Sequence, residues 1–179
     1  MSNIVGNLVK AVALLVGLPA VALLVYDTVA IRPHLAEIEG FLATADVQDA
    51  TPPSIVRDLI DAGAGSPGSH ATRLVTTRIY SNLSQGQWHV RNALWRILLP
   101  LHFDKTQMYG LYATLAYNGT DYGLSNFSRR EYGKALDQLS PMQAARTVAI
   151  THAPTTYLKD RDRLNQRAMM LLTKSGHAP

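Results

Sequence analysis

The chain has no cysteine among its 179 residues, and only 17% of its residues are charged. The first absence excludes disulfides, thiol nucleophiles and cysteine-ligated metal centres. The low charge, beside a hydrophobic content of 47%, excludes wholesale disorder. The six histidines are scattered, with no His-Glu-x-x-His or other paired spacing, so no metal site is expected.

Several catalytic and binding motifs are also missing. No Gly-x-Ser-x-Gly or Ser-x-x-Lys pattern occurs, so chemistry through a serine nucleophile is not expected. The glycine-rich stretch at 63–68 lacks the ending of a phosphate loop, and we expect no cofactor. The net charge of +4 suits an anionic partner such as phospholipid. No nucleic-acid motif accompanies that charge, so nucleic acid is not an expected partner.

An apolar run near the N-terminus indicates a membrane anchor. Residues 4–25 are interrupted only by Lys10, and a helix of that length is about 33 Å long, against roughly 30 Å for a bilayer core. Lys10 lies near one end, and Pro19 predicts a mild kink that membrane helices tolerate. We expect 1–32 to be a transmembrane anchor and 33–179 a single helical domain. A cleaved signal peptide is the rival interpretation, although Thr28-Val29-Ala30 is a poor cleavage site.

The remainder of the chain predicts an all-α fold class. Apolar residues recur at helical spacing, and no alternating strand pattern appears. Ser140, Pro141 and Gln143 form a typical helix start, Gly133 a helix end, and residues 118–121 a turn. Residues 63–68 predict a flexible connector. We expect helices at residues 33–45, 54–61, 71–83, 90–101, 106–117, 124–132, 140–151 and 160–174.

The last third of the chain carries a run of motifs at unbroken spacing. These are YGK at 132–134, LS at 139–140, AA at 144–145 and APTTY at 153–157, followed by an arginine-bearing segment. In this run the chain resembles the peptidoglycan glycosyltransferases, the transglycosylase domain of bifunctional penicillin-binding proteins and its monofunctional relatives. Weaker similarity extends over about 52–172.

That resemblance implies a fold, a location and a reaction. The family consists of bacterial proteins with one transmembrane helix and a lysozyme-like helical domain outside the inner (cytoplasmic) membrane. They polymerise the disaccharide of lipid II while its diphosphate-linked lipid stays in the membrane. We therefore expect the N-terminus in the cytoplasm and the soluble domain on the extracytoplasmic side.

The family's catalytic motifs are degenerate in this chain. The base, a Glu in a Glu-Asp-x-x-Phe-x-x-His-x-Gly motif, is matched only by Asp61, which sits about one position early. In the second motif only Thr76 and Asn82 match. The third keeps Arg91 but has Trp95 in place of its Glu, and the fourth also loses its Glu. The motifs that surround the family's site are partly retained, while its acidic residues are replaced or displaced.

Two functions follow from this degeneracy. The leading hypothesis is a pseudoenzyme, a non-catalytic transglycosylase-like protein that serves as an accessory subunit of a larger membrane complex. Its partners would be other membrane-protein subunits and membrane lipid, with lipid II or glycan as a further ligand. No catalytic residue is then expected. The candidate ligand-binding residues are Arg73, Thr76, Asn82, Arg91 and Lys134.

The alternative is a divergent, active peptidoglycan glycosyltransferase. It would use Asp61 as the base and Arg91 to bind the diphosphate of lipid II. A lytic transglycosylase is a third and weaker hypothesis. It also needs a catalytic Glu, and neither Glu131 nor the pair Glu37 and Glu39 is obviously placed for it.

Overall fold

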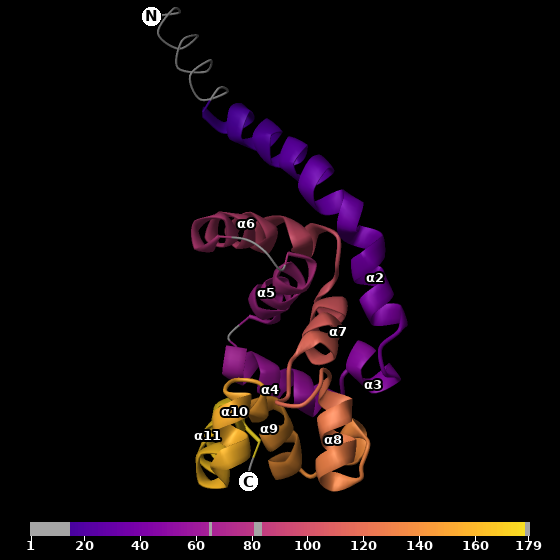
Figure 1. Ribbon diagram of the computed structural model, residues 1–179, viewed down its shortest axis with the longest axis vertical. Coiled ribbons are helices and arrows are strands. Elements are labelled where there is room, and N and C mark those ends of the chain that lie inside the picture. Colours follow the sequence, from indigo (N-terminus) through magenta and orange to yellow (C-terminus); the bar gives the residue numbers. More distant parts are fainter. Residues whose placement is uncertain (1–14, 65, 81–83, 178–179) are drawn as a thin grey trace, which may run out of the picture. The chain divides into compact units, whose positions relative to one another are not determined.

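The computed structural model describes residues 15–64, 66–80 and 84–177 (Figure 1). Within these ranges the chain is helical and contains no strand, only an isolated bridge between Tyr117 and Tyr122. The all-α prediction is therefore confirmed for the described residues. The chain divides into two compact units, residues 1–37 and 38–179.

The first unit is helical throughout its described part. Residues 15–26 form an α-helix, followed by the π-helical turn η1 (Asp27–Ile31) and the 3₁₀ turn η2 (Arg32–His34). Arg32 Nε lies 2.9 Å from Asp27 Oδ2. The helix α2 (Leu35–Ala43) begins in this unit and continues into the second.

The helical stretch Leu15–Ala43 is long and apolar enough to cross a membrane, a property that a signal sequence shares. Its most apolar window has a mean hydropathy of 1.7. Large apolar side chains remain exposed along it, among them Leu15 at 77% and Leu24 at 64%. The predicted span begins at residue 4, and its part before residue 15 lies outside the described residues.

The second unit is a bundle of short helices. Their bounds are α3 (Val47–Ala50), α4 (Ser54–Ala64), α5 (Pro67–Ile79), α6 (Gln85–Leu98), η3 (Leu99–Leu101), α7 (Lys105–Leu115), α8 (Leu124–Tyr132), η4 (Leu136–Gln138), α9 (Pro141–Ile150), α10 (Pro154–Lys159) and α11 (Arg161–Ser175).

Two groups of helices make up this unit. In one, α11 and α4 pack on α9 through buried residues such as Leu59, Val148 and Leu164. In the other, α5 packs against α7 and α6, and α7 also contacts α3. Each fully buried Leu or Val contributes roughly 1.5–3 kcal/mol to folding. The α3–α7 contact depends on Gly110, since a Cβ there would clash with the Ala50 carbonyl oxygen.

The helix end predicted at Gly133 and the helix start predicted at Ser140 are confirmed. The Ser140 Oγ accepts a hydrogen bond from Gln143 N at 3.3 Å, and Gln143 Oε1 accepts one from Ser140 N at 3.0 Å. Pro141 is the first helical residue of α9. Gly133 closes α8 in the left-handed conformation, with φ 65°. A turn at 118–121 is present as well, with Asn118 N donating to the Asp121 carbonyl.

The predicted connector at 63–68 is wrong at both ends. Helix α4 continues to Ala64, and α5 already begins at Pro67, because proline is well suited to the first turn of a helix. The same preference explains α10, which begins at Pro154 and was not predicted. Helix α6 begins at Gln85, before the predicted start at residue 90, since Ser84 and Gln87 form a capping box.

Candidate functional site

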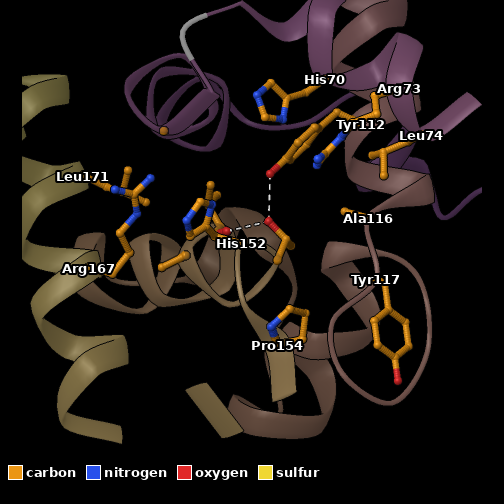
Figure 2. Close-up of a pocket in the computed structure, with 14 residues that line it drawn as sticks. His70, Arg73, Leu74, Tyr112, Ala116, Tyr117, His152, Pro154, Arg167 and Leu171 are labelled. Atoms are coloured by element: carbon orange, nitrogen blue, oxygen red, sulfur yellow. Dashed lines mark hydrogen bonds between the residues drawn. The ribbon is translucent and has the colours of Figure 1, made fainter. Parts of the chain in front are cut away.

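A pocket of about 180 Å³ lies in the second unit, where helices α5, α7, α9 and α11 come together (Figure 2). Its described wall carries two arginines and two histidines, together with hydroxyl groups, and no carboxylate lines it among the residues that the structure describes. The cationic and titratable residues that line it are His70, Arg73, His152 and Arg167.

Helical spacing and chain turns explain how these side chains meet. His70 and Arg73 are three residues apart on α5, so they share one face of that helix. Arg167 and Leu171 are four apart on α11 and reach the pocket from another side. His152 lies in the turn after α9. In Figure 2, His70 and Arg73 lie above the pocket, with His152 and Arg167 to its left.

A pair of hydroxyl groups forms part of the pocket wall. The Tyr112 hydroxyl lies 2.7 Å from Thr151 Oγ1, and the Thr151 hydroxyl donates to the Val148 carbonyl at 2.8 Å. Since Thr151 has one hydrogen to donate, Tyr112 is the donor to Thr151. Burial raises the pKa of Tyr112, although the positive charges of Arg73 and Arg167 act in the opposite direction. Tyr112 is therefore a neutral phenol rather than a base.

His70 experiences the positive charge of the pocket. Burial lowers its pKa, and the charges of Arg73, His152 and Arg96 lower it further. The imidazole is thus held in its neutral form. The centroids of the His70 and Tyr112 rings lie 6.3 Å apart, in an edge-to-face arrangement. An anion in the pocket would reverse this effect, because it would stabilise the protonated ring.

The two arginines of the pocket have no acidic partner among the described residues. No ion pair of Arg73 or Arg167 occurs there, whereas Arg161 pairs with Glu131 at 2.9 Å and Arg163 with Asp160 at 3.0 Å. The Arg167 Nε is buried and has no hydrogen-bond acceptor among the described residues, and its Nη1 contacts Met170 Sδ at 3.5 Å. The pocket therefore has an excess of positive charge that this part of the chain does not neutralise.

Of the five candidate ligand-binding residues, Arg73 lines the pocket and the others lie elsewhere or outside the description. Thr76 is buried in α5, where its hydroxyl donates to the Thr72 carbonyl at 2.9 Å. The Arg91 guanidinium stacks 3.9 Å from the centroid of the Tyr80 ring.

The remaining two candidates lie away from this pocket or are not described. Lys134 follows α8, and its Nζ lies 3.4 Å from Gln143 Oε1 at the start of α9. Asn82 lies outside the described residues. The structure thus brings one of the five predicted residues to the cationic pocket.

Asp61, the candidate base, lies in a different depression. Its carboxylate accepts a hydrogen bond from the Tyr109 hydroxyl, and Lys105 Nζ lies 3.7 Å from the same oxygen. Arg57 and Asp58 also line this depression, which measures about 200 Å³, and Arg91 does not. Trp95, at the position of the family's second carboxylate, is fully buried. Asp61 and Arg91 therefore do not share a pocket among the described residues.

Sequence reasoning missed the histidines of the pocket. The helix predicted at 71–83 starts after His70, whereas α5 begins at Pro67 and therefore includes both His70 and Arg73. His152 and Arg167 belong to distant segments, and one sequence carries no information on which helices pack together. No family model matches the chain, and no curated protein matches it. The similarity to the transglycosylases therefore rests on the motifs alone.

Proposed function

We propose that this chain is a membrane-anchored, non-catalytic, transglycosylase-like protein that serves as an accessory subunit of a larger membrane complex. The observation that carries the non-catalytic assignment is the pocket wall, whose described residues offer cations and neutral hydroxyls but no carboxylate. Glycosyl transfer needs a group that removes the proton from the attacking hydroxyl, typically worth 10²–10⁴ in rate. Asp61, the candidate for that group, is held by Tyr109 and Lys105 in another depression.

The subunit role is supported by an apolar stripe on α6. Val90, Leu94, Ile97 and Leu101 are spaced by four, three and four residues, so they lie along one face of the helix and its 3₁₀ continuation. Three of them are strongly exposed, with Val90 at 65%, Ile97 at 59% and Leu101 at 74%. An exposed apolar stripe of this kind typically marks a contact with another protein or with lipid.

One observation favours the second candidate, a divergent glycosyltransferase. His70 is held neutral by its surroundings and lies in the pocket, so it is able to accept a proton. In that version His70, rather than Asp61, would activate the acceptor hydroxyl, and the pocket arginines would bind the diphosphate.

Incubation of the purified full chain with labelled lipid II separates the two functions. A non-catalytic protein yields no polymer, with an active monofunctional transglycosylase as the positive control. Polymer formed by the wild type would refute the non-catalytic proposal. His70→Ala and Asp61→Asn would then identify the base, since loss of activity follows only the residue that removes the proton.

Purification in mild detergent tests the subunit role. We expect a partner membrane protein to co-purify with the wild type and to be lost from the double variant Ile97→Glu, Leu101→Glu. Val47→Glu is the matched control, because Val47 is also apolar and 78% exposed but lies on α3. Migration of the wild type as a lone chain at low salt would contradict the proposal.

The orientation and the finer fold are also proposals. A lysozyme-like arrangement is supported by a pocket between two packed groups of helices, and superposition of an experimental structure on a lysozyme would test it. The absence of cysteine permits a clean topology test. Lys174→Cys, at an exposed position, should react with a membrane-impermeant maleimide on intact bacterial spheroplasts if the body is extracytoplasmic. Labelling only after lysis would reverse the orientation.

A further inference from the structure

A separate pocket lies among helices α8, α9 and α11, and it shares no lining residue with the cationic pocket. Helix α9 contacts both α8 and α11, so residues far apart in the sequence meet there. The pocket measures about 260 Å³, below the range of roughly 300–1,000 Å³ typical of drug-sized ligands, so it suits a small chemical group. Its described lining is Glu131, Arg146, Arg161, Leu164 and Asn165.

An ion pair between two helices forms part of this pocket's wall. Arg161 Nη1 lies 2.9 Å from Glu131 Oε1, and Arg161 Nη2 donates to Glu131 Oε2 at 3.1 Å. Arg161 therefore contacts both oxygens of the one carboxylate that lines the pocket among the described residues. The two charges offset each other, and the pair connects α11 to α8. The charge that is left over in the described wall is that of Arg146.

The Arg146 guanidinium has no such partner in the described part of the chain. Its Nε is buried and donates to no acceptor there, and no ion pair of Arg146 occurs among the described residues. Arg146 is the only charged residue of α9, and its neighbours Ala145 and Thr147 are fully buried. A buried donor without an acceptor is costly, and a charged donor more so, which makes a ligand the better explanation of this arginine.

A second donor lies beside Arg146. The Tyr132 hydroxyl is buried and has no hydrogen-bond partner among the described residues. Burial raises the pKa of Tyr132, and the nearby charges of Arg146 and Arg161 only partly oppose this, so the phenol keeps its proton at neutral pH. Its ring packs edge-to-face on Phe127, with centroids 6.2 Å apart. Arg146 and Tyr132 are thus both able to donate, and the group that would complete them is an acceptor.

We propose that this pocket binds the carboxylate of a small organic acid or of an acidic side chain. The carboxylate accepts hydrogen bonds from Arg146 and Tyr132, and its single charge balances the single charge that the Arg161–Glu131 pair leaves over. A carboxylate is planar and matches the fork of one guanidinium. A phosphoryl group would bring roughly two negative charges to that one cation. The inference is independent of the cationic pocket and of whether the chain is catalytic.

NMR of the arginine side chains tests the inference on the full chain in micelles of a neutral detergent. The Nε–H signal of Arg146 is assigned by its loss in Arg146→Lys. Propionate should shift this signal in a saturable way, because the carboxylate becomes its acceptor. Propionamide has nearly the same shape without the charge, so it should bind about ten-fold more weakly.

Arg163 is the matched control in the same spectra. It lies on α11, its side chain is 67% exposed, and its Nε pairs with Asp160 at 3.0 Å. Propionate should shift its Nε–H signal no more than sodium chloride of equal ionic strength does. Arg163→Ala removes the same charge from the surface, and it should keep the affinity for propionate within about two-fold.

Two variants of the pocket itself use the side-chain amide of Asn165 as the reporter, because Asn165 also lines the pocket. Arg146→Ala should weaken propionate binding by at least about ten-fold. Tyr132→Phe keeps the ring and removes the hydroxyl, so it should weaken binding by about three- to ten-fold. If Arg146→Ala loses its helical circular dichroism, Arg146→Lys replaces it. Lysine keeps the charge without the fork and should bind with intermediate affinity.

A second probe identifies the source of the carboxylate. The doubly capped amino acid N-acetyl-glutamate N-methylamide presents the same group on a side chain within a peptide frame. If it binds as tightly as propionate or more tightly, the ligand is an acidic side chain of another protein. If propionate alone binds, the ligand is a free organic acid.

Several outcomes overturn the inference. A propionate-induced shift of Arg146 no larger than that of Arg163 would refute the site. Equal affinities for propionate and propionamide would show that the pocket does not recognise the charge. Equal losses in Arg146→Ala and Arg163→Ala would reduce the binding to a general charge effect. None of these results bears on the proposed function, which is tested separately by lipid II polymerisation and by co-purification.

Discussion

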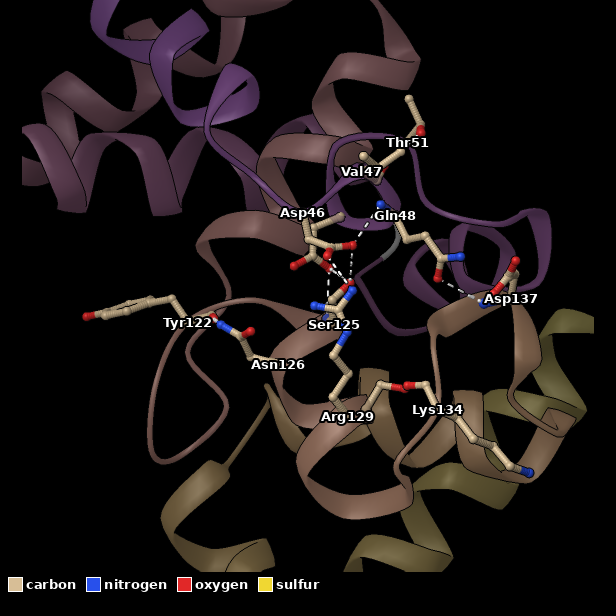
Figure 3. Close-up of polar contacts among 12 residues, drawn as sticks. Asp46, Val47, Gln48, Thr51, Tyr122, Ser125, Asn126, Arg129, Lys134 and Asp137 are labelled. Carbon is tan, nitrogen blue, oxygen red and sulfur yellow. Dashed lines mark hydrogen bonds and ion pairs between the residues drawn. The ribbon is translucent and has the colours of Figure 1, made fainter.

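Two regions of the second unit contain arginines whose contacts differ. At the contact between α3 and α8, Arg129 pairs with Asp46, and Asp46 also caps α3 by accepting a hydrogen bond from Gln48 N at 2.9 Å (Figure 3). In the cationic pocket, Arg73 and Arg167 line a cavity and have no ion pair among the described residues. The first region contains acids and bases in contact, and the second contains bases alone.

In the α3–α8 region, charged side chains make hydrogen bonds that connect the two helices. Asp49 accepts hydrogen bonds from Ser125 N at 2.9 Å and from Ser125 Oγ at 3.0 Å, near the start of α8. These hydrogen bonds offset part of the cost of desolvating the buried Asp49 carboxylate. The pocket arginines have no such acidic partners in the described part of the chain, so they contribute little to folding. Their presence is better explained by a ligand, since binding sites commonly sacrifice stability.

The largest effect is expected from a small change in the α3–α8 region. Gly123 has φ 97°, and a Cβ there would lie 2.7 Å from Asp49 Oδ2. Gly123→Ala combines backbone strain with displacement of Asp49, so it should lower the free energy of unfolding by roughly 3 kcal/mol. That loss corresponds to a fall in Tm of about 6–12 °C by circular dichroism.

Gly86→Ala is the matched control for this change. Gly86 lies in α6, and no atom lies within 4 Å of a Cβ built there. Alanine is a better helix former than glycine, so this variant should be neutral or more stable by up to about 1 kcal/mol. Equal destabilisation by both substitutions would mean that the contact between Gly123 and Asp49 does not organise this region.

A second prediction concerns the pH dependence of stability. Burial raises the pKa of Asp49 to about 6 from its ordinary value of 3.8, although the Ser125 hydrogen bonds act in the opposite direction. The folded state therefore binds this proton more tightly than the unfolded state. The resulting stability is fully present below pH 3.8 and is lost as the pH rises through about 6.

Two substitutions of Asp49 separate its charge from its hydrogen bonds. Asp49→Asn keeps an acceptor for Ser125 and removes the buried charge, so it should stabilise the protein by roughly 1–3 kcal/mol at pH 8 and by little near pH 4. Asp49→Ala leaves the Ser125 N–H without an acceptor and should cost about 1–3 kcal/mol near pH 4. Thermal melts of both variants across this range check the prediction. A pH-independent gain for Asp49→Asn would contradict it.

Much of the fold was predictable from the sequence, because its signals are local. The helix start at Ser140, the helix end at Gly133 and the turn at 118–121 depend on residues a few positions apart. The missed features are partly local too, since Pro67, inside the predicted connector, and Pro154, where no helix was predicted, each begin a helix. A proline is compatible both with a loop and with the first turn of a helix.

The candidate site was much less predictable. Arg73 was among the candidate ligand-binding residues, whereas the approach of His152 and Arg167 to His70 depends on how α5, α9 and α11 pack. That no carboxylate lines the pocket among the described residues is likewise a consequence of how the helices pack. Asp61 was the candidate base because of its place in the sequence, but its side chain contacts Tyr109 and Lys105 in another depression.

A smaller effect compares a paired arginine with an unpaired one. Arg129→Ala removes an ion pair in which the arginine side chain is 56% exposed, so it should destabilise the protein by about 0.5–1 kcal/mol. Arg73→Ala removes a cation without an acidic partner in the described part of the chain, and the change should stay within about 0.3 kcal/mol. Unfolding melts at low salt measure the difference. A larger loss for Arg73→Ala would assign that arginine to folding.

The most direct test of an anion-binding pocket is an NMR pH titration of the His70 ring in the full chain. His70→Gln would assign the signal, and pyrophosphate would be absent or saturating. Burial and the charges of Arg73, His152 and Arg96 lower the pKa of His70, so a bound anion should move the titration midpoint to higher pH. The ring signals of His177, which lies 3.1 Å from Asp58, should not respond to pyrophosphate. A His70 midpoint that is unaffected by saturating pyrophosphate would contradict the central claim that this pocket binds an anion.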